Sequence, residues 1–265
     1  MTYALAPRPP ATGPLAGLGV LVTRPARQAG GFAQKLAALG ATPVIYPAIV
    51  ILSPVDRASL DAAHAHLASY DFAFFVSANA VEYGAPAAAH WPATLVAFAP
   101  GPGTAEALAA VGIHHVRVPA TSFDSEGLLA LPELADVRGR RAVIFRGEGG
   151  REALAEALAA RGAHVDHAIC YRRAAPSGGA AGLVEAFSQG RVHAVTVTSS
   201  EGVDNLWQVL GDEGRALARR VPWFAPHPRI AERARGHGLE VVATAAGDAG
   251  LLAGLVAWAQ AHAPQ

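Results

Sequence analysis

The sequence contains a single cysteine, Cys170, among 265 residues. One thiol excludes an intramolecular disulfide and a metal site built from cysteines, and it is typical of a reducing compartment. Neither sign of charge is in excess, because Lys plus Arg and Asp plus Glu both number 21. No global field therefore attracts nucleic acid or anionic lipid, and an anionic ligand must be held by local groups.

Long apolar runs are also missing. The longest, such as Leu251 to Trp258, are far shorter than the roughly 20 residues that span a bilayer. Residues 1–13 are rich in proline and lack the apolar core of a signal peptide, so we expect a loose leader there. These absences predict a cytoplasmic protein that is not bound to membranes.

The motifs of nucleotide cofactors are incomplete. The segment GPGTAEA at 101–107 has only two glycines of the pattern G-x-G-x-x-G, and no G-x-x-x-x-G-K-[ST] occurs. This disfavours binding of NAD or FAD and excludes a P-loop ATPase or kinase. His64 and His66 are two residues apart on a predicted helix, so they point to different faces, and no H-E-x-x-H accompanies them. We expect neither a cofactor nor a metal.

The sequence does contain a regular alternation of two patterns. Short β-rich runs alternate with Ala- and Leu-rich helical stretches, as in GVLVTR, then QAGGFAQKLAALG, then TPVIYPAIVIL over residues 19–52. This order predicts an α/β protein with parallel sheets covered by helices. A length of 265 residues exceeds the usual single-domain size of about 100–200, so two domains are expected.

An internal repeat supports two domains of one plan. Residues 19–41 align without gaps on residues 141–163, an offset of 122, and this alignment matches Arg24 with Arg146. Two halves that share an order of elements indicate a duplicated α/β unit.

The same offset matches further positions. It places Ser77 on Ser199, and it aligns 43–54 with 165–176, two extended runs that both end in proline. Equivalent segments of this kind are where the chain is expected to cross between domains as a pair of strands. Tyr171 would then lie at a hinge and face a cleft.

Several predicted strands end in small polar or glycine-rich turns that lead into helices. In parallel α/β sheets these carboxyl ends form the binding crevice, and the helix N-termini offer N–H groups to an anion. Arg24 and Arg146 each follow such a strand. Each could bind a carboxylate of a ligand or form a structural ion pair, and the sequence favours neither role. Tyr171 is by itself an ordinary residue for the edge of a core. Arg172 and Arg173 alternate in direction, so at most one faces the site.

Five segments together resemble uroporphyrinogen-III synthase in their order and spacing, over nearly the whole chain after the leader. They are VTRP at 22–25, FVSANAVE at 75–82, RGEGGREAL at 146–154, ICYRR at 169–173 and SS-x-G-V-x-N-L at 199–206.

The resemblance implies two α/β domains joined by a two-stranded β-ladder. Mapped onto this chain, one domain comprises residues 14–44 with 175–263, and the other comprises residues 53–167. The crossover strands are expected at 45–52 and 168–174.

The resemblance also implies a lyase that needs no cofactor. This enzyme cyclises hydroxymethylbilane to uroporphyrinogen III in haem biosynthesis, with inversion of ring D and loss of water. Tyr171 matches the family's catalytic tyrosine and is expected to protonate the departing hydroxyl. The substrate's carboxylates are expected to bind at Arg24, Ser77, Thr104, Arg146 and Ser199. The chain departs from the family at Ile230, where relatives often carry a small hydroxyl residue.

A second reading stays open, because a fold does not by itself decide a function. A non-catalytic two-domain protein that binds a ligand, such as a sensor, would share this plan. For the enzyme, we expect a monomer that acts on a small molecule, without nucleic acid or membrane. Handover of the substrate from hydroxymethylbilane synthase is a candidate route.

Overall fold

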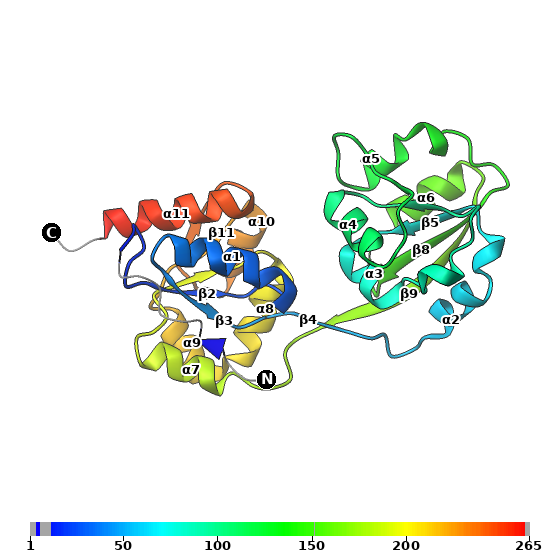
Figure 1. Cartoon of the computed structure of the whole chain (residues 1–265). Coiled ribbons are helices and arrows are strands. Elements are labelled where there is room, and N and C mark those ends of the chain that lie inside the picture. The colour runs from blue at the N-terminus through cyan, green and yellow to red at the C-terminus, as the bar shows by residue number, and fades with distance from the viewer. Residues whose placement is uncertain (1–3, 6–11, 151, 263–265) are drawn as a thin grey trace. The chain divides into compact units, whose positions relative to one another are not determined.

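The computed structural model describes residues 4–5, 12–150 and 152–262 (Figure 1). The chain separates into two compact units. Unit 1 contains the chain up to Val50 and from Ala174 onward, and unit 2 contains Ile51–Arg173. The chain therefore leaves unit 1 once and returns to it once.

Unit 1 is built on a six-stranded sheet in which every neighbouring pair is parallel except β1 with β3. In spatial order its strands are β1 (Ala4–Leu5), β3 (Thr42–Ile45), β2 (Gly19–Val22), β10 (Ala194–Thr196), β11 (Trp223–Ala225) and β12 (Val241–Ala243). The expected leader is mostly outside the described residues, but β1 within it pairs with β3. The sequence did not predict this strand.

Helices cover both faces of the unit 1 sheet. They are α1 (Ala26–Ala38), α7 (Ala181–Ser188), α8 (Ser200–Val209), α9 (Gly211–Ala218), α10 (Pro228–Gly236) and α11 (Gly247–Ala261). One core contains Val20 and Phe224 with residues of α1 and α11, and the other contains Leu21 and Trp223 with residues of α7 to α10. Neighbouring strand residues thus enter opposite cores, as the alternation of side chains requires. Figure 1 shows α1 and α11 on one face and α7 and α9 on the other.

Unit 2 repeats this architecture. In spatial order its strands are β4 (Val50–Leu52), β9 (His164–Ala174), β8 (Arg141–Gly147), β5 (Phe72–Phe75), β6 (Val96–Phe98) and β7 (Val116–Arg117). Its helices are α2 (Ala58–Ala65), α3 (Ala78–Gly84), α4 (Pro102–Ala110), α5 (Ser125–Leu129) and α6 (Ala153–Ala160), with short 3₁₀ turns at Leu67–Ser69, Ala88–His90 and Pro132–Leu134. Residues of α2 to α4 share one core with Phe75 and Phe145, and residues of α5 and α6 share the other with Phe74 and Ile144.

The two sheets have the same strand order. The order β3-β2-β10-β11-β12 in unit 1 corresponds to β9-β8-β5-β6-β7 in unit 2, and the offset of 122 residues aligns β3, β2 and β10 with β9, β8 and β5. The predicted α/β class, with parallel sheets flanked by helices, is confirmed. β4 lies beside β9 in the second sheet.

One predicted strand is shorter than expected. The run TPVIYPAIVIL over 42–52 forms two strands, β3 and β4, which belong to different sheets, and residues 46–49 between them are in neither. Pro47 explains the interruption, because proline has no N–H to donate to a neighbouring strand. The strand expected over 45–52 is thus limited to Val50–Leu52, apart from Ile45, which ends β3.

Candidate functional site

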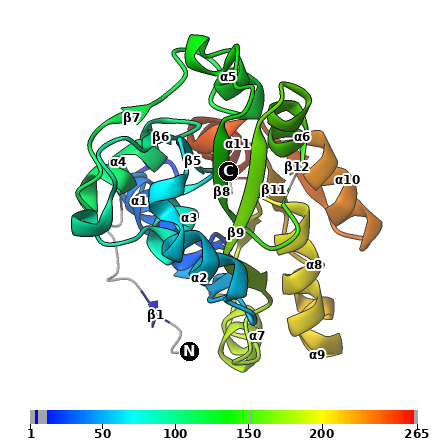
Figure 2. The same cartoon turned by 90° about the vertical axis from the view of Figure 1, so that its right-hand side faces the viewer.

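A cavity of about 260 Å³ lies in unit 2, at the carboxyl ends of β5 and β8 and along β9. Figure 2 shows β8 and β9 running side by side, as their parallel pairing requires. The cavity is lined by Val76, Ser77, Ser125, Ile144, Arg146, Gly147, Glu148, Gly150, Leu154, Tyr171 and Arg173. This is the edge at which parallel α/β sheets bind ligands.

Tyr171 reaches the cavity from β9. The register of β9 on β8 shifts by one residue after Arg146, so that Gly147 pairs with Tyr171. Gly147 has no side chain to oppose the Tyr171 ring, since a Cβ there would lie 2.6 Å from both Cε2 and Cζ. Only 4% of Tyr171 is exposed. The ring is thus enclosed, because the bare backbone of Gly147 lets it lie against β8.

Ser77 lies opposite the Tyr171 hydroxyl. It caps the N-terminus of α3, where its Oγ accepts a hydrogen bond from the N–H of Ala80 at 3.2 Å. The same Oγ is 3.2 Å from the Tyr171 hydroxyl, and either oxygen can donate in that pair. A capping serine keeps its own hydrogen available for a second partner. The phenol is therefore oriented by a group that is itself fixed by a helix end.

Arg146 brings a buried positive charge to the cavity. The Arg146 side chain lies on the α6 side of β8, and only 5% of the residue is exposed. Its Nη1 donates to Glu152 Oε1 at 2.8 Å and to His167 Nδ1 at 3.3 Å. A guanidinium has no acceptor, so His167 Nδ1 must accept, and a neutral ring carries its proton on Nε2. That atom is 3.6 Å from Glu152 Oε2, which closes the contacts among the three side chains.

The sequence reading missed Glu152, His167, Gly147 and Gly150. Glu152 follows Arg146 in the same glycine-rich segment. An acidic residue shortly after an arginine at a strand end is a sequence signal for an ion pair between the two. His167 becomes a neighbour only through the pairing of β8 with β9. The two glycines act by lacking a Cβ, which no residue pattern reveals without the neighbouring strand.

Cys170 precedes Tyr171 but takes no part in the cavity lining. It is fully buried, and this burial raises the pKa of its thiol to about 12. The thiolate form is therefore absent near neutral pH, which disfavours a nucleophilic role as the sequence indicated.

The structure brings three of the predicted site residues together, namely Tyr171, Ser77 and Arg146. Thr104 is also in unit 2, buried in the first turn of α4, but it does not line the cavity. Arg24 and Ser199 belong to unit 1.

Arg24 makes contacts that join elements of unit 1. Its Nη1 forms an ion pair with Asp248 Oδ1 at 2.6 Å, and its guanidinium lies 4.4 Å from the centre of the Phe32 ring. Asp248 also pairs with Lys35 at 2.8 Å. These contacts link the start of α11 to α1, which is the structural alternative foreseen for Arg24.

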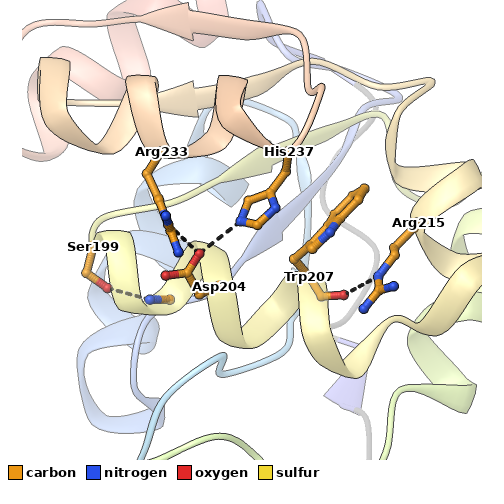
Figure 3. Close-up of polar contacts among 7 residues, drawn as sticks. Ser199, Asp204, Trp207, Arg215, Arg233 and His237 are labelled. Atoms are coloured by element: carbon orange, nitrogen blue, oxygen red, sulfur yellow. Dashed lines mark hydrogen bonds and ion pairs between the residues drawn. The ribbon is translucent and has the colours of Figure 1, made fainter.

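Ser199 caps α8 as Ser77 caps α3, with its Oγ accepting from the N–H of Gly202 at 3.0 Å (Figure 3). Further along α8, Asp204 Oδ1 accepts from Arg233 Nε at 2.6 Å and lies 2.9 Å from His237 Nε2. Figure 3 shows that these two partners reach Asp204 from α10 and its C-terminal end. Asp204 thus fixes α8 to α10 and helps to hold the turn that Ser199 caps.

Replacing Asp204 by asparagine should lower the melting temperature at neutral pH by roughly 2–4 °C at most, since the cluster is partly exposed. Burial opposes ionisation of Asp204, but the hydrogen bonds from Arg233 and His237 hold its pKa below the ordinary value. A lowered pKa gives stability that is present above the ordinary Asp pKa, about 3.9, and is lost as the pH falls through the folded-state value. The difference in melting temperature between the two proteins should therefore shrink below that range. A difference that persists there would contradict the charge-based account.

Comparison with known proteins bears on this site. The family model described as "Uroporphyrinogen-III synthase HemD" matches residues 31–253. The uroporphyrinogen-III synthase of Salmonella typhimurium is 35% identical over 196 residues, which are 72% of this chain and 80% of that protein. The chain belongs to the uroporphyrinogen-III synthase family.

Other members of the uroporphyrinogen-III synthase family agree. The Escherichia coli enzyme is 34% identical over 198 residues, which cover 73% of this chain and 80% of that protein. Among solved structures, a mutant uroporphyrinogen III synthase from Thermus thermophilus matches with a TM-score of 0.56 and 23% identity, over 93% of this chain and all of that chain. The Helicobacter pylori protein matches with a TM-score of 0.55 and 12% identity, over 92% and 98%. These structures support the fold alone.

Proposed function

We propose that this chain is a uroporphyrinogen-III synthase, which cyclises hydroxymethylbilane to uroporphyrinogen III with inversion of ring D and loss of water. Membership of the family supports the reaction. The observation that carries the proposal within the structure is the Tyr171 hydroxyl, 3.2 Å from Ser77 Oγ in a cavity that a buried arginine also lines. A proton donor and an anion-binding group are thus adjacent.

The first step is loss of the bilane's hydroxyl group. Tyr171 donates its phenolic proton to that oxygen, and the C–O bond breaks. Water departs, and an azafulvene cation remains. Ser77 Oγ already accepts from the N–H of Ala80, so it can turn its hydrogen toward the phenol oxygen as the proton departs. A positioned acid of this kind typically contributes about 10²- to 10⁴-fold to the rate.

The later steps depend on how the bilane is held. Attack by the substituted carbon of ring D gives a spiro pyrrolenine, and its fragmentation and reclosure invert that ring. Hydroxymethylbilane also closes without enzyme to the uninverted isomer, so the protein has to favour one reactive conformation. Arg146 serves this purpose by binding one carboxylate of the substrate, because a guanidinium matches a carboxylate in charge and geometry.

The test is an assay with freshly generated hydroxymethylbilane, in which the products are oxidised and the porphyrin isomers I and III are separated. We expect isomer III to form in proportion to the protein added, without metal or nucleotide. Isomer I alone, from a folded sample at ample concentration, would contradict the proposal. The chain would then be a ligand-binding or sensor protein of the same fold.

The remaining expectations from the sequence stay predictions. Arg24, Thr104 and Ser199 are proposed to bind further carboxylates, alone or through the amides of their turns. A monomeric state, a cytoplasmic location, the absence of a cofactor and handover from hydroxymethylbilane synthase are proposed on the same basis.

A further inference from the structure

The guanidinium of Arg146 has two edges that differ in their surroundings. Nη1 contacts Glu152 and His167, as described above. Nε and Nη2, on the other edge, have no hydrogen-bond partner among the residues that the structure describes. Gly150 lies beside this second edge, and both Arg146 and Gly150 line the cavity.

Gly150 lies against the Nε–Nη2 edge because it has no side chain. A Cβ on Gly150 would lie 2.5 Å from Nη2, 3.0 Å from Nε and 3.1 Å from Cζ of Arg146. Only a glycine therefore lets the guanidinium keep this position at the cavity, and a methyl group at residue 150 would displace it.

The size of the cavity limits what enters it. Pockets that enclose a whole drug-sized ligand measure roughly 300–1,000 Å³, and the bilane is larger than such a ligand. A cavity of about 260 Å³ is too small for the whole bilane and matches one of its carboxylate-bearing side chains. Among the residues that the structure describes, its lining supplies two arginines, Arg146 and Arg173, and one acidic residue, Glu148.

We propose that this cavity is a subsite for a single acetate or propionate group of the substrate, and that Glu152 and His167 are positioning residues for it. They hold Nη1, so that the rest of the guanidinium keeps its place in the cavity wall. A buried guanidinium that is fixed on one edge gives up little freedom when the other edge binds a carboxylate. The inference rests on the proposed function and adds the part of the substrate that this site takes.

The first test is Gly150→Ala, in which the added methyl group pushes the Arg146 guanidinium out of its position at the cavity. The backbone of Gly150 is not in the left-handed region, so the substitution adds no backbone strain. We expect KM for hydroxymethylbilane to rise about tenfold to a hundredfold, the range for loss of a hydrogen bond to a charged group. The control is Gly31→Ala, at an exposed position of α1 with no atom near the added methyl, where KM should stay unchanged.

The positioning role has its own signature. His167→Asn keeps an acceptor for Nη1, whereas His167→Ala removes it, so the asparagine variant should retain a KM near that of the wild type and the alanine variant should not. Glu152→Gln should likewise raise KM less than Glu152→Ala. A purely structural role would lower the melting temperature of the alanine variants without changing KM, and this result would overturn the assignment.

A binding measurement separates this inference from the proposed function. Uroporphyrin III, the stable oxidised product, is titrated against the protein as the free octa-acid and as its octamethyl ester. We expect the free acid to bind more tightly than the ester in the wild type, and this preference to shrink in Gly150→Ala. Equal preference in the two proteins would refute the subsite even if isomer III is formed. A protein that forms no isomer III but loses the preference in Gly150→Ala would retain the subsite and refute the synthase.

Discussion

Replacing Tyr171 by phenylalanine should reduce the rate of isomer III formation by about 10²- to 10⁴-fold, the range for a positioned proton donor. The substitution removes one hydroxyl and leaves the ring, whose packing against Gly147 and near Tyr83 is unchanged. The melting temperature should therefore fall little, because Ser77 Oγ keeps its hydrogen bond from Ala80. The rate is measured by separating the oxidised isomers at several times.

The kinetics of Tyr171→Phe distinguish a proton donor from a binding residue. KM should change much less than the turnover number, because the hydroxyl acts in the transition state rather than in binding the substrate. Turnover equal to that of the wild type, in a folded Tyr171→Phe variant, would remove Tyr171 as the acid. Protonation by water or by a carboxyl group of the substrate would then replace it.

Gly147→Ala should lower turnover by about 10²-fold although it deletes no functional group, since misplacing a catalytic group by about 1 Å has effects of that size. The added Cβ would lie 2.6 Å from two carbons of the Tyr171 ring, so the ring has to move. The backbone of Gly147 needs no left-handed conformation, which makes the clash the main effect. Overpacking of this kind typically costs about 1–3 kcal/mol of stability as well.

A double-mutant cycle shows whether the ring is the cause. In a Tyr171→Phe background the acid is already lost, so adding Gly147→Ala should reduce turnover by much less than it does alone. Fully additive effects would mean that Gly147 acts through another group. Gly31→Ala serves again as the control for a glycine whose added methyl meets no neighbour.

The fold class and the two related halves of this protein could be predicted from the sequence, because the residue patterns that indicate them are visible along the chain. Alternating apolar periods indicated the class, and an alignment of the chain on itself indicated two halves of one plan. Ser77 and Arg146 were singled out for the same reason, since each lies at the carboxyl end of a strand that is visible in the residue pattern. Tyr171 was singled out by the family resemblance rather than by its own pattern.

What the sequence did not predict depends on pairing between strands. His167 meets Arg146 only through the register of β8 with β9, and the shift after Arg146 is what sets Tyr171 against Gly147. The close approach of Arg146 to Gly150 likewise depends on the fold and not on a residue type alone. The run over residues 42–52 forms two strands rather than one, because the segment at Pro47 interrupts it and the apolar residues continue into β4.

The two units share a strand order but differ in residue type at the position of the proposed proton donor. At the position that the repeat aligns with Tyr171 the first half has Ile49, and opposite Gly147 it has Pro25. A hydrocarbon and a rigid ring thus stand at the aligned positions of the phenol and of the residue that makes room for it. The two halves are therefore not interchangeable, because a chain made from two copies of the first half would lack any counterpart of this phenol.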